Sequence, residues 1–106
     1  MLGLFGSISL KEVDAFAKTL AQDLASQYPP AVAQSNGPRL SEKRLATLLE
    51  DVCNRAVAFK NEHKLSVHKK ARLGNTFRYE LEALGYSRTF IDTATEGLVV
   101  FLGRRQ

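Results

Sequence analysis

Hydrophobic residues recur at three- and four-residue steps in four separate stretches of the chain, the spacing of one face of an α-helix. A serine precedes each stretch, and at Ser9 it forms a capping-box pattern with Glu12. No segment alternates at period two over more than a few residues, so no strand is expected. The pattern predicts an all-α, compact bundle of about four helices, over approximately 9–28, 41–62, 66–84 and 87–102.

The segments between these helices differ in length. Pro29 and Pro30 end the first helix, because neither can donate a backbone hydrogen bond. The segment 29–40 is expected to be a flexible linker, and it is the one long connection. About a dozen residues can span ~40 Å when extended. The first two helices therefore need not be antiparallel neighbours, and a first helix swapped between two copies is an open alternative.

The third and fourth helices carry features of close packing. Gly74 adjoins the inward stripe of the third helix, and a mid-helix glycine costs ~1 kcal/mol relative to alanine. A close crossing of two helices is the best reason for it. The stripe consists of Leu73, Phe77, Leu81 and Leu84. Gly85 is expected in the left-handed conformation that ends a helix, with Tyr86 packed beneath it.

Length and composition point to one helical domain over 1–106, with an apolar arm at 1–8 and a basic tail at 103–106. The single cysteine, Cys53, excludes an intrachain disulfide and suits a buried thiol in a reducing compartment. No stretch approaches the ~20 apolar residues of a membrane span, and the start of the chain lacks the pattern of a secretory signal. We therefore expect a cytoplasmic protein and no membrane partner.

The histidines and short motifs of the sequence do not form a catalytic or metal-binding pattern. His63 and His68 are five residues apart and straddle a predicted helix start, so they do not share a helical face as zinc ligands would. The sequence contains no phosphate-binding glycine loop and no nucleophile elbow. It therefore predicts a protein that is not an enzyme, with no metal, no cofactor and no evident small-molecule substrate.

Positive charge is concentrated in one part of the chain. The net charge is +4, and six basic residues fall within 60–78 against Glu62 alone. His68, Lys69 and Lys70 crowd the first turn of the third helix, where the helix dipole favours acids. A polar stripe also runs along that helix. The expected anion- or partner-binding residues are Lys60, Lys64, His68, Lys69, Lys70, Arg72, Asn75, Arg78 and Tyr79.

Two interpretations of these cations remain open. They form an ordinary solvated helix face, or they bind an anionic partner. The function expected is a small, non-enzymatic helical interaction or regulatory module that engages a protein partner or a second copy of itself. The alternative is a nucleic-acid-binding protein that uses the basic face of the third helix. Val99 and Val100 widen the apolar stripe of the last helix, and we expect them either in a deep core or at an interface.

Overall fold

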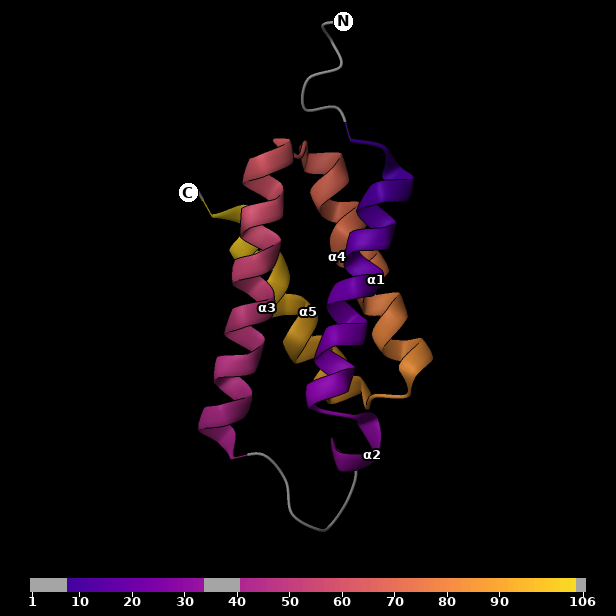
Figure 1. Ribbon diagram of the computed structural model, residues 1–106, viewed down its shortest axis with the longest axis vertical. Helices are drawn as coiled ribbons and strands as arrows, with labels where there is room; N and C mark the ends of the chain where they lie inside the picture. The colour runs from indigo at the N-terminus through magenta and orange to yellow at the C-terminus, as the bar shows by residue number, and fades with distance from the viewer. Residues whose placement is uncertain (1–7, 34–40, 105–106) are drawn as a thin grey trace, which may run out of the picture.

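The computed structural model describes residues 8–33 and 41–104. This part of the chain holds five helices and no strand (Figure 1). The four long helices begin and end within one residue of the predicted ranges, which confirms the all-α bundle. The helices are α1 (Leu10–Gln27), α2 (Pro30–Ala33), α3 (Glu42–His63), α4 (Val67–Leu84) and α5 (Arg88–Gly103).

Serine side chains start all four long helices. In each case the hydroxyl accepts the backbone N–H three residues later, and at Ser9 the Glu12 carboxylate also accepts the backbone N–H of Ser9. These bonds satisfy amide groups that have no partner within the helix. The capping residues are Ser9, Ser41, Ser66 and Ser87.

The short helix α2 lies at the start of the segment 29–40, which was expected to be a flexible linker. The backbone N–H groups of Val32 and Ala33 both donate to the carbonyl oxygen of Pro29, at 2.9 and 3.0 Å. Proline suits the first turn of a helix, because the N–H that it lacks would have no helical acceptor there. The rest of that linker, at 34–40, lies outside the described residues, as do 1–7 of the predicted arm and 105–106 of the predicted tail.

The long helices pack as two parallel pairs. Arg72, early in α4, binds Asp14, early in α1, and Lys60, late in α3, binds the backbone of Leu102, late in α5. Thus α1 runs beside α4 in the same direction, α3 runs beside α5, and α4 joins the two pairs by packing against α5 (Figure 1). α1 and α3 contact one another less, consistent with the long connection between them.

The core lies between these helices. Phe77 is the largest side chain with no exposure, and Gly74 beside it sits where α4 meets α5. A Cβ atom on Gly74 would lie 3.2 Å from Cγ2 of Val99, which explains the glycine as a close crossing. Leu84 is more exposed than the stripe predicts, because it lies in the last turn of α4. The other side chains with no exposure are Val13, Ala17, Leu20, Ala21, Leu24, Ala56, Leu73, Leu81 and Leu98.

Aromatic side chains close one end of the bundle. Tyr86 and Phe90 stack at 4.7 Å between ring centroids, and Tyr28 lies beside both. The Tyr86 hydroxyl donates to the backbone oxygen of Tyr28 at 2.5 Å, which ties the start of α5 to the end of α1. Burial, and secondarily the neighbouring Tyr28, raises the pKa of Tyr86 to about 12. At this end the two tyrosines are therefore buried and hydrogen-bonded, whereas Phe90 is half-buried.

Candidate functional site

The turn between α3 and α4, residues 64–66, lies at the opposite end of the bundle, where α1 begins (Figure 1). We call this the cationic end, because Lys64, Lys69 and Lys70 lie at or just after this turn. Lys64 ends α3 in the left-handed conformation, with φ of 50°, and its backbone N–H donates to the carbonyl of Lys60. Leu65 is buried beneath it, and Ser66 caps α4. The Lys64 side chain is exposed beside the first turn of α4, which carries no acid.

Lys60 belongs to the predicted basic set, yet the structure buries it. It is 8% exposed, and its ammonium group donates to the backbone oxygens of Leu102 at 3.3 Å and Arg104 at 2.9 Å. These carbonyl groups lie at the C-terminal end of α5, where no backbone N–H of the helix can donate to them. The expectation that Lys60 faces water is therefore wrong: its charge satisfies the end of a neighbouring helix.

Arg72 is also held within the molecule. Its guanidinium makes two hydrogen bonds of 2.8 Å to the carboxylate of Asp14, and the Thr76 hydroxyl donates to the same carboxylate at 2.7 Å. The Arg72 bonds, followed by that of Thr76, lower the pKa of Asp14 to about 2. Arg72 thus fixes α4 to α1, and much of its charge is neutralised.

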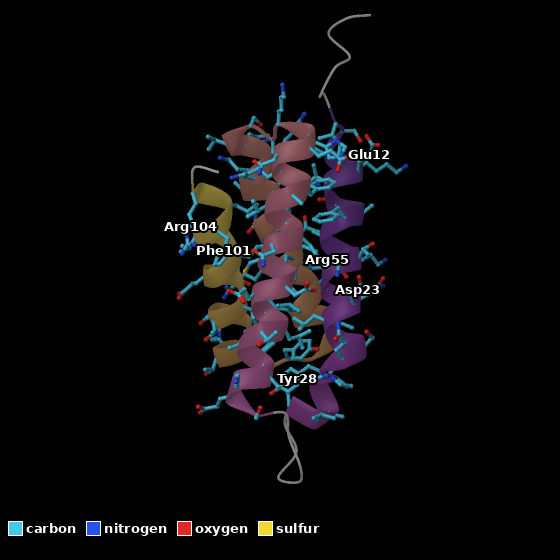
Figure 2. The ribbon with its side chains drawn as sticks, turned by 60° about the vertical axis from the view of Figure 1, so that its left-hand side comes forward. Glu12, Asp23, Tyr28, Arg55, Phe101 and Arg104 are labelled. Atoms are coloured by element: carbon cyan, nitrogen blue, oxygen red, sulfur yellow. The ribbon has the colours of Figure 1, made fainter. Side chains whose placement is uncertain are left out.

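Arg78 is the third cation with an internal partner. It pairs with Asp92 of α5 at 2.6 Å. A similar pair elsewhere joins Arg55 of α3 to Asp23 of α1, and Figure 2 shows these two side chains meeting between their helices. The predicted basic run therefore divides into two sets. Lys60, Arg72 and Arg78 bind other parts of the molecule and support the fold. Lys64, Lys69 and Lys70 take part in none of the ion pairs among the described residues.

The polar stripe of α4 faces outward as predicted. His68 and Asn75 are exposed, and Tyr79 is 66% exposed. Asn75 and Tyr79 line a shallow groove against α1, together with Lys11 and Lys18. The two α1 lysines were not among the predicted residues, because only the packing of α1 on α4 brings them to this face.

An apolar hollow at the cationic end was also missed by the sequence analysis. It has a volume of about 310 Å³ and lies between the first turns of α4 and the last turns of α5. Val67 on its rim is 78% exposed, and Val99 is 51% exposed. A signal was present, since Val67 is apolar but falls off the inward stripe of its helix. The lining residues are Val67, Lys70, Ala71, Val99, Leu102 and Gly103.

Val99 and Val100 were expected either in a deep core or at an interface. Both are more than half exposed, so they do not belong to the core. Nearby, the Arg104 guanidinium stacks over the Phe101 ring at 4.3 Å (Figure 2). This contact leaves a cation beside the last turn of α5.

Within 8–33 and 41–104, no three His, Cys, Asp or Glu side chains are grouped so that they could hold a metal ion. Burial raises the pKa of the Cys53 thiol, which disfavours the reactive thiolate. His63 packs against the Phe59 ring, at 4.6 Å between centroids.

No helix in the described ranges is both long enough and apolar enough to cross a bilayer. Comparisons with known proteins give no relative from which a function could be transferred. The chain matches no protein-family model, no curated protein and no solved structure.

Proposed function

We propose that the protein is a non-enzymatic interaction module whose cationic end binds an acidic, partly apolar segment of a protein partner. The exposure of Val67, at 78%, carries this proposal. An apolar side chain in the first turn of a helix, beside a hollow with an apolar lining, presents surface that association would remove from water.

Charge complementarity specifies the partner. Lys70 is the one charged residue in the lining of the hollow, Lys69 precedes it in α4, and Lys64 ends α3 just before that helix. Such cations attract an acidic partner and orient it, while the valines supply the apolar contact. With a volume of about 310 Å³, the hollow can accept apolar side chains of a partner segment.

The backbone of Lys64 is a second argument. A residue with a Cβ atom in the left-handed conformation costs roughly 1 kcal/mol, and glycine avoids this cost. The corresponding position between α4 and α5 is Gly85. A lysine kept where glycine would stabilise the fold is consistent with a role for its side chain.

The test uses designed helical peptides of about 18 residues, five turns, labelled for fluorescence anisotropy. One peptide carries leucines on one face and glutamates on the other, a second has lysine in place of glutamate, and a third has the first composition scrambled. We expect binding of the first peptide alone, weakening between ~50 mM and ~200 mM salt.

Two double variants of the surface and one control variant test where the peptide binds. Lys69→Glu with Lys70→Glu should weaken peptide binding at least about tenfold, or about 1.4 kcal/mol. The control, Lys18→Glu with Arg88→Glu, makes the same change in net charge at exposed sites outside the hollow. It should bind the acidic peptide as tightly as the wild type does. Val67→Ser with Val99→Ser tests the apolar contribution. If the lysine pair and its control weaken peptide binding equally, the proposal is overturned. A parallel measurement uses vesicles of anionic lipid in place of the peptide. Binding of these vesicles without binding of the acidic peptide would also overturn the proposal.

A second candidate function is nucleic-acid binding, favoured by the groove between α1 and α4. Tyr79 offers an exposed ring for base stacking and Asn75 an amide, with Lys11 and Lys18 placed to contact phosphates. Titration with single-stranded and duplex nucleic acid tests it. Lys11→Glu with Lys18→Glu should abolish binding, and log affinity should fall steeply with log salt. Absence of binding at ~50 mM salt would remove this candidate.

A further inference from the structure

A second groove runs along the other side of α5, between α5 and α3. It has a volume of about 470 Å³ and is lined mainly by small or apolar side chains. We call it the α3–α5 groove. Its lining comprises Lys43, Ala46, Thr47, Leu49, Glu50 and Cys53 from α3, and Thr93, Ala94, Gly97 and Phe101 from α5.

The middle of this groove is open. A Cβ atom built on Gly97 would meet nothing within 4 Å, and Ala46 on the facing helix is exposed. Leu49 and Phe101 are only half-buried. A helix from another molecule could therefore approach the backbone here closely and cover apolar surface.

The charges on the rim have opposite signs and a regular spacing. Lys43 and Glu50 are seven residues apart on α3, two helical turns, so they lie on the same face about 10 Å apart. This separation prevents them from pairing with each other. Neither of them takes part in an ion pair among the described residues.

We propose that the α3–α5 groove is the contact surface between two copies of this chain, related by a two-fold axis. The axis crosses α3 at the level of residues 46 and 47, midway between the two charges. In this arrangement Lys43 of each copy faces Glu50 of the other, which makes two equivalent ion pairs around an apolar centre. A different partner would need the reverse charge pattern at the same spacing, whereas a second antiparallel copy supplies it by symmetry.

This inference is independent of the proposed partner. The apolar hollow lies between α4 and α5, and its lining shares no residue with that of the groove. A dimer through the groove leaves Val67 and Lys70 outside the contact. Either proposal can therefore fail while the other holds.

Sedimentation equilibrium from about 1 μM to about 1 mM provides the test. The wild type should show a monomer–dimer equilibrium. Lys43→Glu and Glu50→Lys should each raise the dissociation constant about tenfold or more, since each places like charges opposite one another at two points. The double variant that exchanges both charges should restore dimerisation, because it rebuilds both pairs. All of these sites are exposed, so the helical signal in circular dichroism should not change.

Three outcomes would overturn the dimer: a strict monomer up to about 1 mM, a dimer insensitive to the single reversals, or a double variant as weak as the singles. Cross-linking gives an independent test in a Cys53→Ala background. Ala46→Cys lies near the axis and should form an interchain disulfide under mild oxidation, since its two Cα atoms must approach within about 7 Å. Ala58→Cys, exposed twelve residues further along α3, is the matched control and should not. Equal cross-linking at both sites would contradict the proposed axis.

Discussion

The two short turns of the bundle have the same construction and different consequences. In each, a residue in the left-handed conformation is followed by a buried apolar residue and then by a serine that caps the next helix. At 85–87 the left-handed residue is glycine, and the neighbouring tyrosines close the end of the bundle. At 64–66 the left-handed residue is Lys64, and Val67, the first residue of α4 after this turn, is exposed. One turn is built for stability, whereas the other keeps a charge and an apolar side chain at the surface.

The largest effect on stability is expected at the end of the bundle that holds Tyr28, Tyr86 and Phe90. Tyr86→Ala removes a ring that is 6% exposed and leaves the Tyr28 carbonyl without that donor, so it should cost about 3–5 kcal/mol of unfolding free energy. Tyr86→Phe keeps the ring and should cost about 1 kcal/mol. Urea denaturation followed by circular dichroism measures both. Similar losses for the two variants would mean that the hydroxyl, rather than the packing, holds this end.

The next effect separates the buried Lys60 from Lys69, which is half-buried and has no hydrogen-bonded partner for its ammonium group among the described contacts. Lys60→Met leaves the last carbonyls of α5 without a charged donor and should cost about 1–3 kcal/mol. Lys69→Met is the matched control and should change stability by less than about 0.5 kcal/mol. The same denaturation experiment compares them. A loss at Lys69 as large as at Lys60 would show that the cationic end also supports the fold through its surface lysines.

The two turns can be made more alike by one substitution. Lys64→Gly should stabilise the protein by up to about 1 kcal/mol, because glycine adopts the left-handed conformation without strain. The same change should weaken binding of the acidic peptide. Lys64→Ala retains the strain and removes the charge, so it should weaken binding without stabilising the fold. If Lys64→Gly destabilises the protein, the lysine side chain has a structural role that the fold does not reveal.

The smallest effect concerns the pH dependence of the Asp14–Arg72 pair. The pKa of Asp14 is about 2 in the folded state, below its usual 3.8, so the carboxylate contributes stability above about pH 4 and loses it as the pH falls toward 2. The contribution is small, since both side chains are about one-third exposed or more. The melting temperatures of the wild type and Asp14→Asn should therefore differ most near about pH 6 and converge near about pH 2. A constant difference across this range would contradict the assignment.

The sequence was sufficient for the features that depend on neighbouring residues. The four serine caps, Gly85 and the inward positions Leu73, Phe77 and Leu81 follow from local rules, and each lies where it was predicted. The short helix α2 was missed because proline both ends one helix and can begin the next.

The candidate surface was harder to predict, because distant residues determine which cations are free. The partner of Lys60 lies 42 residues away and that of Arg72 lies 58 residues away. Neither spacing nor charge runs contain this information. Lys64 at the turn, and Lys69 and Lys70 in the first turns of α4, remain candidates because they take part in none of the ion pairs among the described residues.

The parallel pairing of α1 with α4, and of α3 with α5, bears on how the chain folds. Helices joined by a short turn can pair as soon as both exist, but parallel neighbours must close a long loop first. Here the contact between Asp14 and Arg72 spans 58 residues, and so does the contact between Tyr28 and Tyr86. The chain should consequently fold more slowly than an up-and-down bundle of equal length, and late, after nearly all of it has left the ribosome.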